Sequence, residues 1–476
     1  MNKNLSLLIT ASTLLGCSQG YEEATSTTVA SITLTGVTFV SESGIAAEHC
    51  RLPATLLAQV GAGRQVRLLR SNPTTLALCT VDAVAAPQVA GAAPRAQMSA
   101  ASLRGRFGLA ADAGLEVTGV SVSNALAGGA DGPIAVQQNL PSPNFTFGVP
   151  DVQEWRSPTM PASADRVAYT APHGLIEPGT EDQVTAALGA AWSAGWIGMY
   201  RETTSAAGFG QYHTTSTELS VVSFPGLGAM LATGFRYAVS FHGVSDDCTA
   251  CGDVFLGGGE DTTFRSGLAE MLREVLPLPA DGGVAPTVVV AAAGADLGGA
   301  SAQNYVNLLA SGHGLQIEQK ARVRDSTTYR TNVATAVRTY MDCLIETADY
   351  NTARLSSSNA AYTVLIPSYL GGACPRAMVD FYARVAPAVI TGEGMICAVG
   401  ARAHVDVFRR RDDLSFQRMG GGYRLGVPGA NGCVWTDEPD YSTLDPATLS
   451  PGLYRVVVRA NNPDGSIQFA RVSTNI

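Results

Sequence analysis

Short apolar runs alternate with longer segments of helical periodicity through the middle of the chain. The runs of strand length lie at 167–170, 237–241, 288–293 and 315–318, and the helical segments lie at 181–192, 264–275, 302–310 and 326–346. This alternation is typical of parallel strands, because each parallel connection needs a helix to return the chain. We therefore expect an α/β domain with a mostly parallel sheet and helices on both faces.

Segments with strand-like alternation of polar and apolar residues flank this region on both sides. On the N-terminal side, runs such as 32–39 and 66–70 are separated by Gly, Pro and Ser, which predicts a small β domain. The C-terminal runs have the spacing of a β-sandwich and lie at 362–366, 378–385, 404–408, 454–459 and 467–472. The expected domains are an N-terminal β domain at 29–150, the α/β domain at 151–357 and a C-terminal β-sandwich at 358–476.

The first residues have the pattern of an export signal. Lys3 precedes an apolar stretch at 5–15, and Leu14-Leu15-Gly16-Cys17 resembles the cleavage box of bacterial lipoproteins. We expect a lipoprotein signal peptide at 1–17, a lipidated Cys17 and a polar tether at 18–28. A plain secretory signal with an incidental cysteine is the alternative. The protein is then secreted, or it is an exported lipoprotein of the cell envelope, with the outer membrane favoured and a lipid anchor as its only membrane contact.

The number of cysteines favours disulfide bonds in an exported protein. The chain has nine cysteines, so an even number remains after Cys17, which favours disulfide bonds over reactive thiols. Their clustering favours the pairs Cys50–Cys79, Cys248–Cys251, Cys343–Cys374 and Cys397–Cys433. For Cys248 and Cys251 the alternative is a structural zinc site, although no second Cys-x-x-Cys or His pair accompanies them.

Charge and motif content exclude two classes of ligand. The chain has 31 Lys and Arg against 40 Asp and Glu, a net charge of −9, which is the wrong sign for a nucleic-acid binder. The sequence has no G-x-G-x-x-G or G-x-x-x-x-G-K motif, so we expect no nucleotide ligand.

Candidate metal ligands lie where two apolar strands end in His-Gly. The strand at 167–170 runs into Ala-Pro-His173-Gly, the strand at 237–241 runs into His242-Gly, and Glu177 follows His173 on a Gly/Pro-broken turn. Open α/β sheets place their sites at such strand ends. Two His and one Glu that leave a fourth position for water are typical ligands of a catalytic zinc ion. We therefore expect one zinc site.

A second carboxylate lies on the strand at 315–318. Gln316 and Glu318 alternate with apolar residues, so both polar side chains leave the same face of the strand. Glu318 is the candidate general base, and a structural ion pair with Lys320 or Arg322 is the alternative.

These blocks resemble the zinc-dependent poly-γ-glutamate hydrolase family over roughly residues 150 to 350. The similar blocks are Ala-Pro-His-Gly running into Ile-Glu-Pro-Gly-Thr, a later strand ending in His-Gly, and a Gly-x-Gln-x-Glu strand followed by Arg. The resemblance implies a fold similar to zinc carboxypeptidases, with one Zn²⁺ per chain. It also implies that His173, Glu177 and His242 are the zinc ligands and that Glu318 is the general base. The spacing from His173 to Glu177 is four residues, where the family commonly has five.

The resemblance extends to residues around these blocks. Arg324 matches the arginine after the third block, and it or Arg322 is expected either to stabilise an oxyanion or to bind a substrate carboxylate. Asn304 matches a residue before that block and is a candidate for substrate binding. His213, in Gln-Tyr-His-Thr-Thr-Ser, is expected to orient substrate or a ligand, with an ordinary loop histidine as the alternative.

Two functions remain open on the sequence alone. One is a zinc hydrolase that cleaves amide bonds, such as the γ-glutamyl linkages of poly-γ-glutamate or a related γ-linked peptide. An acidic protein gains no long-range electrostatic steering towards such a polyanion, so local arginines must bind it. The other is a catalytically inactive binding lipoprotein of the cell envelope, whose β domains carry the function.

Overall fold

The structure is a computed structural model. It describes residues 33–124, 152–157, 160–161, 166–189, 192–200, 205–276, 278, 283–345, 362–367, 377–383, 389–396, 402–425, 434–435, 449–460 and 467–475. The expected signal peptide, Cys17 and the tether lie outside these residues. No helix within the described ranges is long and apolar enough to cross a membrane.

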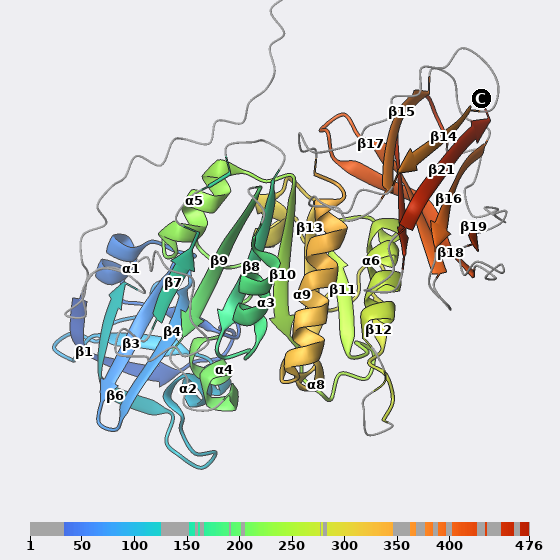
Figure 1. The fold of residues 1–476 in the computed structure, drawn as a ribbon. Helices are drawn as coiled ribbons and strands as arrows, with labels where there is room; N and C mark the ends of the chain where they lie inside the picture. The colour runs from blue at the N-terminus through green and yellow to red at the C-terminus, as the bar shows by residue number, and fades with distance from the viewer. Residues whose placement is uncertain are drawn as a thin grey trace, which may run out of the picture.

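The first part of the described chain is a closed β-barrel (Figure 1, blue to cyan). Its strands are β1 (Thr33–Ser41), β2 (His49–Arg51), β3 (Gln65–Ser71), β4 (Thr74–Val81), β5 (Arg95–Met98) and β6 (Glu116–Asn124), in the order β1-β5-β2-β4-β3-β6. Helix α1 (Ala54–Val60) connects β2 to β3 and helix α2 (Ala100–Phe107) connects β5 to β6, and both contribute side chains to the barrel core. The Cys50–Cys79 disulfide is present as predicted, and it joins β2 to β4 inside the barrel core.

The centre of the molecule is a seven-stranded sheet in the order β12-β11-β13-β10-β8-β9-β7. Its strands are β7 (Val152–Arg156), β8 (Val167–Gly174), β9 (Ser193–Tyr200), β10 (Tyr237–Gly243), β11 (Val254–Gly258), β12 (Val288–Val290) and β13 (Gly314–Gln319). The pairs β8–β9, β8–β10, β10–β13 and β11–β12 are parallel, as predicted. The pairs β7–β9 and β11–β13 are antiparallel, so the sheet is mixed.

Helices cover both faces of this sheet (Figure 1). They are α3 (Thr180–Ala187), α4 (Ser205–Tyr212), α5 (Pro225–Thr233), α6 (Thr262–Val275), α7 (Tyr305–Leu309), α8 (Ala321–Arg324) and α9 (Thr327–Asp342). Side chains from alternate positions of each strand pack against α3, α6 and α9 on one face, as Val239 and Phe241 of β10 do. The intervening positions, such as Ala238, face α5 and α7.

The barrel packs on the second of these faces. Ala77 and Cys79 of β4 point into the barrel core, whereas the intervening Leu76 and Leu78 belong to the core beneath α5 and α7. Alternation along a single strand therefore supplies side chains to two cores.

The last part of the chain forms two four-stranded sheets (Figure 1, orange to red). One contains β14 (Tyr362–Pro367), β21 (Ile467–Asn475), β16 (Val389–Ile396) and β19 (Val434–Trp435). The other contains β15 (Ala377–Ala383), β20 (Gly452–Ala460), β17 (Arg402–Arg410) and β18 (Phe416–Leu425), and it packs on α6. Phe408, Phe416 and Val457 of this second sheet join the core of the central domain.

Candidate metal centre

Neighbouring parallel strands bring the predicted site residues to one edge of the sheet. His173 lies near the end of β8 and His242 near the end of β10, while β13 carries Glu318. In the register of β10 and β13, His242 lies directly beside Glu318. His242 and Glu318 leave the face that carries α5 and α7, because His242 shares the parity of Ala238 and Glu318 alternates with Ile317 on the other face. On β8 the register shifts between Ala171 and Gly174, so simple alternation does not hold at His173. The site thus lies at the carboxyl ends of the strands, as the sequence predicted.

The turn after β8 brings Glu177 back to His173. The Glu177 amide donates to the His173 carbonyl oxygen at 2.9 Å, and Leu175 between them has a left-handed backbone with φ of 75°. Glycine adopts that conformation more cheaply than leucine does. The four-residue spacing still places Glu177 Oε1 3.0 Å from His173 Nδ1, so the shortened loop keeps the pair together.

The two strand-end histidines present the same nitrogen to Glu177. His173 Nδ1 lies 3.0 Å from Glu177 Oε1, and His242 Nδ1 lies 3.7 Å from Glu177 Oε2. The Nε2 atom of each ring makes a hydrogen bond to a residue other than Glu177. His173 Nε2 donates to the Thr214 carbonyl oxygen at 2.9 Å, and His242 Nε2 is hydrogen-bonded to Ser240 Oγ at 2.7 Å. Such outer bonds fix the ring orientation of metal-binding histidines.

This arrangement leaves acceptors facing one another. Because a carbonyl only accepts, His173 Nε2 carries the hydrogen, and Nδ1 of the neutral ring is then an acceptor aimed at a carboxylate. Glu177 Oε2 is buried and has no hydrogen-bond partner among the described residues. A proton or a cation must lie between such groups. Two imidazoles and a carboxylate are a donor set that fits a divalent cation of the zinc type.

Burial and charge set the protonation of these groups. Burial favours the neutral acid of Glu177, but the His173 imidazole outweighs it and lowers the pKa of Glu177. Burial also favours neutral His173, yet Glu177 raises the pKa of that imidazole. Burial lowers the pKa of His242 to about 3, so this ring is neutral and able to act as a ligand.

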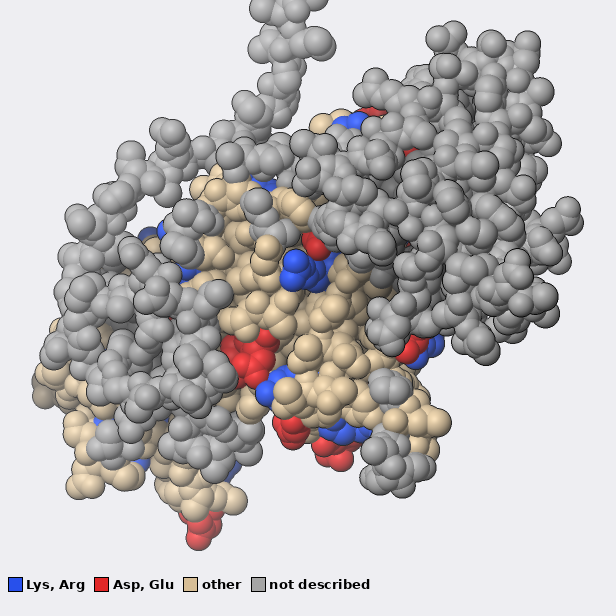
Figure 2. Space-filling model, in the orientation of Figure 1, with Lys and Arg blue, Asp and Glu red and all other residues tan. Residues whose placement is uncertain are grey.

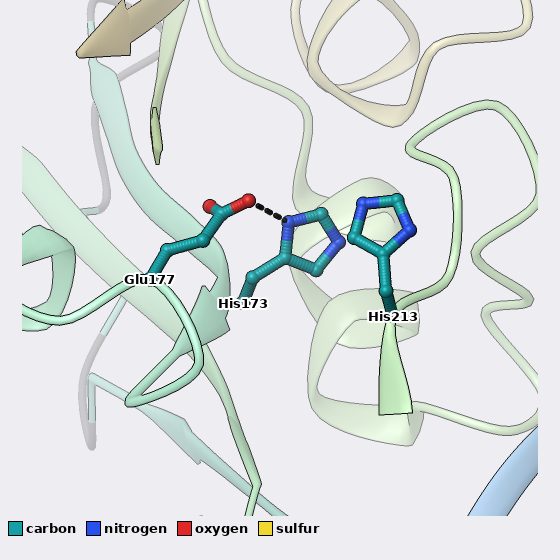
Figure 3. Close-up of side chains that lie close together, drawn as sticks. All are labelled: His173, Glu177 and His213. Carbon is teal, nitrogen blue, oxygen red and sulfur yellow. Dashed lines mark hydrogen bonds and ion pairs between the residues drawn. The ribbon is translucent and has the colours of Figure 1, made fainter. Parts of the chain in front are cut away.

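His213 also lies in the site. It follows α4, and its ring centroid is 4.4 Å from that of His173. His173, Glu177 and His213 each offer one ligand atom such that all three atoms lie within 4.8 Å of one another (Figure 3). The sequence assigned His213 to orienting substrate or a ligand, and the structure places it among the candidate ligands. His173 and Glu177 therefore belong to two overlapping ligand sets, one with His242 and one with His213.

A relay of amide side chains holds Glu318. Gln316 Nε2 donates to Glu318 Oε1 at 2.7 Å, and Asn304 Nδ2 donates to Gln316 Oε1 at 2.7 Å. Asn304 is 2% exposed and its side chain caps α7, so it positions Gln316 instead of lining an open surface. Burial first, and then the nearby Glu177, raises the pKa of Glu318.

The two arginines after β13 have different surroundings. Arg324 Nε donates to the Gln319 carbonyl oxygen and Nη1 to the Pro178 carbonyl oxygen, each at 3.0 Å. A Cβ on Gly243 would lie 2.8 Å from Arg324 Cζ, so Arg324 lies against the last residues of β10 and β13 and against the turn after β8. Arg322 instead pairs with Asp253 at 3.2 Å, and its side chain is 44% exposed. The structure thus brings Arg324, and not Arg322, to the site.

Cys248 and Cys251 do not form a metal site. Cys248 and Cys251 are joined in a disulfide, as predicted, which leaves no thiolates for a structural zinc. Cys343 is also disulfide-bonded. Its expected partner Cys374, and the expected pair Cys397–Cys433, lie outside the described residues.

Charge on the face drawn in Figure 2 is dispersed. Its described surface is mostly uncharged, and small acidic and basic groups lie side by side. This face therefore offers no broad field of one sign in the part of the surface that the structure describes.

Comparison with known proteins finds a family to which the central region is similar. Residues 151–348 match the family model described as poly-gamma-glutamate hydrolase. A bacteriophage poly-gamma-glutamate hydrolase is 22% identical, with a TM-score of 0.31, over 41% of this chain and 90% of that chain. The zinc-free form of YndL is 18% identical, with a TM-score of 0.30, over 40% of this chain and 89% of that chain.

A metallo-carboxypeptidase from Burkholderia cenocepacia is 11% identical, with a TM-score of 0.24, over 48% of this chain and 75% of that chain. No curated protein matches the chain. The match at 151–348 confirms the resemblance that the sequence motifs indicated: this region of the chain is similar to the poly-gamma-glutamate hydrolase family.

Proposed function

We propose that the protein is a zinc-dependent hydrolase of amide bonds with a carboxypeptidase-like central domain. One observation carries this proposal: the Nδ1 atoms of two buried histidines face the carboxylate of Glu177, one of whose oxygens has no hydrogen-bond partner in the described structure. His173, Glu177 and His242 would hold the ion, as the resemblance implies. When bound, zinc lowers the pKa of a coordinated water towards about 7 and polarises a carbonyl group.

Glu318 is the general base of this proposal. It accepts a proton from the attacking water as the new carbon–oxygen bond forms, and it returns the proton to the amide nitrogen as the carbon–nitrogen bond breaks. The products are a carboxylate and an amine. A raised pKa makes Glu318 a stronger base once ionised, and a cation bound beside it favours that ionised form. Gln316 holds Oε1 and so orients the carboxylate.

Substrate binding belongs to Arg324 and to the surfaces around it. Its bonds to Gln319 and Pro178 use Nε and one N–H of Nη1, and among the described residues Nη2 donates to no partner. We propose that this donor binds a carboxylate or the developing oxyanion. The proposed substrates are the γ-glutamyl linkages of poly-γ-glutamate or of a related γ-linked peptide, in keeping with the family match.

The decisive experiment measures zinc content and poly-γ-glutamate cleavage in the same samples. We expect one zinc per wild-type chain, and we expect His242→Ala to lose both zinc and cleavage. Zinc without cleavage would retain the metal chemistry and exclude this polymer as the substrate. A wild type that takes up no zinc when supplied would overturn the proposal.

We also propose that Cys17 is lipidated and anchors the protein to the cell envelope. Membrane fractionation of Cys17→Ser tests this directly. Release into the soluble fraction is expected, and a wild type that is already soluble would contradict it.

A further inference from the structure

The N-terminal barrel lies outside the matched family region, yet it contacts the segment that carries His213. Helices α2 and α4 touch backbone to backbone, since a Cβ on Gly105 would lie 3.4 Å from the Gly210 carbonyl oxygen. Gln65 Nε2 of the barrel donates to the Glu218 carbonyl oxygen at 2.8 Å, and His49 Nε2 lies 2.8 Å from Glu218 Oε1. The segment at 205–225 is therefore held between the barrel and the central sheet.

This segment supplies several groups to the metal centre. His213 is one of the candidate ligands, and the Thr214 carbonyl oxygen accepts from His173 Nε2 at 2.9 Å. Ser216 Oγ lies 3.5 Å from His242 Nε2. The position of this segment thus sets the orientation of His213 and of both strand-end histidines.

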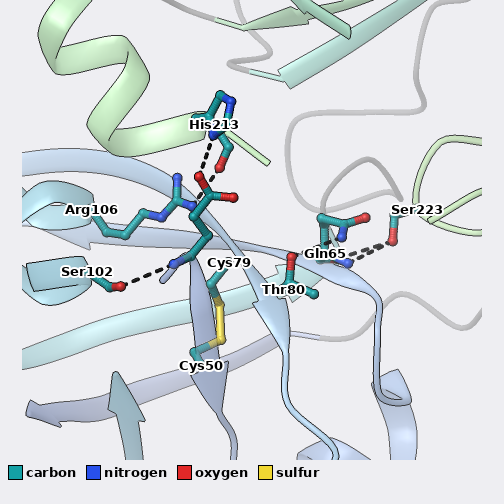
Figure 4. Close-up of a disulfide and its surroundings, with 9 residues drawn as sticks. Cys50, Gln65, Cys79, Thr80, Ser102, Arg106, His213 and Ser223 are labelled. Carbon is teal, nitrogen blue, oxygen red and sulfur yellow. Dashed lines mark hydrogen bonds and ion pairs between the residues drawn. A yellow bond between two sulfur atoms is a disulfide. The ribbon is translucent and has the colours of Figure 1, made fainter. Parts of the chain in front are cut away.

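Glu48 connects the barrel to His213. Its Oε1 is hydrogen-bonded to His213 Nδ1, and its Oε2 accepts from the Thr215 amide at 2.9 Å. The Glu48 amide in turn donates to Ser102 Oγ at 3.2 Å. Arg106 Nη2 donates to the His213 carbonyl oxygen at 2.6 Å (Figure 4). Two barrel side chains therefore fix both the ring and the backbone of His213.

The Glu48 contact determines which nitrogen of His213 faces the site. A carboxylate only accepts, so Nδ1 carries the hydrogen, and Nε2 of the neutral ring is left as an unprotonated acceptor. An unprotonated Nε2 backed by a carboxylate on Nδ1 is the arrangement of histidines that bind metal. It does not suit a hydrogen-bond donor to a substrate carbonyl, so the ligand role is favoured over substrate binding.

The backbone of Glu48 supports a role for its side chain. Glu48 has a left-handed backbone with φ of 68°, a conformation in which glycine is the cheaper residue. Strained residues of this kind concentrate at functional sites. The strain is consistent with a carboxylate that is held in place for its contact with His213.

We propose that the N-terminal barrel completes the metal centre, with Glu48 as a positioning residue that holds His213 so that Nε2 is a further ligand of the ion held by His173, Glu177 and His242, and a five-coordinate ion keeps one position for water. This inference rests on the proposed zinc site, and it places one member of the site outside residues 151–348.

The test measures zinc affinity by chelator competition in the full mature chain. Glu48→Gln is expected to weaken zinc binding about 10- to 100-fold, the usual effect of losing such a partner. His213→Ala should weaken it at least as much. The double variant should bind zinc no more weakly than His213→Ala alone, because Glu48 acts through His213.

Glu218→Gln is the matched control, since it removes a His–carboxylate contact across the same interface without touching His213. It should leave zinc affinity unchanged. In the cobalt-substituted protein, Glu48→Gln should shift the visible absorption bands and Glu218→Gln should not. If Gln disturbs the loop, Glu48→Gly relaxes the backbone and should show the same loss of affinity without a lower Tm.

The outcomes separate the two proposals. A wild type that binds zinc and cleaves substrate, with Glu48→Gln indistinguishable from Glu218→Gln, would overturn the role of Glu48 alone. Additive losses in the double variant would also overturn it, because they would show that Glu48 does not act through His213. A wild type that binds no zinc would overturn both.

Discussion

Two buried carboxylates in one site have opposite protonation preferences. Burial opposes ionisation of both, but His173 outweighs it at Glu177 and lowers the pKa, while at Glu318 the negative Glu177 adds to burial and raises the pKa. Pairs of titratable groups whose pKa values are pushed apart take different roles. Glu177 is suited to bind a cation, and Glu318 is suited to exchange a proton.

Replacing Glu318 tests this division at the level of one residue. Glu318→Gln keeps the volume and can still accept from Gln316, but it cannot take a proton. We expect the zinc content to be retained and kcat to fall by roughly 10² to 10⁴. Metal analysis and cleavage rates on the same preparation check this. Full activity of the zinc-loaded variant would exclude Glu318 as the base.

The sequence motifs did not predict those features of the site that depend on contacts between residues far apart in the chain. The strand-end pattern led to His173, Glu177, His242 and Glu318, because strand ends meet at one edge of a parallel sheet. The contact of His213 with Glu48 spans 165 positions, and no local pattern encodes it. The sequence after β13 likewise did not distinguish Arg324 from Arg322, whose partner Asp253 lies just before β11.

At the scale of elements, helices with a clear apolar face were predicted and glycine-rich ones were not. The expected helix at 302–310 is shorter in the structure, because Asn304 caps α7 and fixes its start at Tyr305. Helix α5, with the sequence PGLGAMLAT, has too many small residues to show a helical period. Strand β11 pairs antiparallel with β13, and the direction of a neighbour cannot be read from an apolar run.

The turn between β17 and β18 contains a strained residue whose replacement should stabilise the protein. Leu414 is 43% exposed with φ of 70°, and a left-handed backbone costs a non-glycine residue about 1 kcal/mol or more. Leu414→Gly should therefore raise the free energy of unfolding. Leu308→Gly is the control, because Leu308 is 39% exposed in α7 and glycine inside a helix costs about 1 kcal/mol.

Urea unfolding of both variants measures the change in unfolding free energy. An increase for Leu414→Gly and a decrease for Leu308→Gly would support the strain argument, and changes of the same sign would refute it.

The disulfide between β2 and β4 should contribute more to stability than the disulfide between Cys248 and Cys251. Cys50 and Cys79 are 29 positions apart, whereas Cys248 and Cys251 are 3 apart. The entropy of closing these loops predicts losses of roughly 3 to 4 kcal/mol for Cys50→Ala/Cys79→Ala and about 2 kcal/mol for Cys248→Ala/Cys251→Ala. Chemical denaturation of both double variants measures the difference. Equal losses would show that loop entropy does not govern these bonds.

At the scale of the whole molecule, stability should depend on a buried acid between α9 and the sheet. Burial raises the pKa of Asp342 to about 6, and Trp192 Nε1 donates to its Oδ1 at 2.9 Å. The native state holds this proton more tightly than the unfolded chain, in which the pKa is about 4. The stabilisation is present at acidic pH and is lost as the pH rises through 6. A fall of about 1 to 2 kcal/mol is expected between pH 5 and pH 8.

Comparison with Asp342→Asn isolates this contribution. Asparagine keeps an acceptor for Trp192 but does not titrate, so its unfolding free energy should change less between pH 5 and pH 8. A wild type and variant with parallel pH profiles would show that Asp342 titrates normally in the folded protein.

By our inference, the barrel and the central sheet both contribute residues to one site. This limits which N-terminal domains can replace the barrel when genes recombine. A breakpoint between residues 124 and 152 would leave two units that each retain a core of their own, yet by our inference it would part His213 from Glu48. A shuffled descendant that acquired a different N-terminal module would keep every motif of the matched region and lose the carboxylate that orients one of its histidines. Inheritance of the hydrolase region is then tied to inheritance of the barrel, and exchange is restricted to modules that present an acid at the same place.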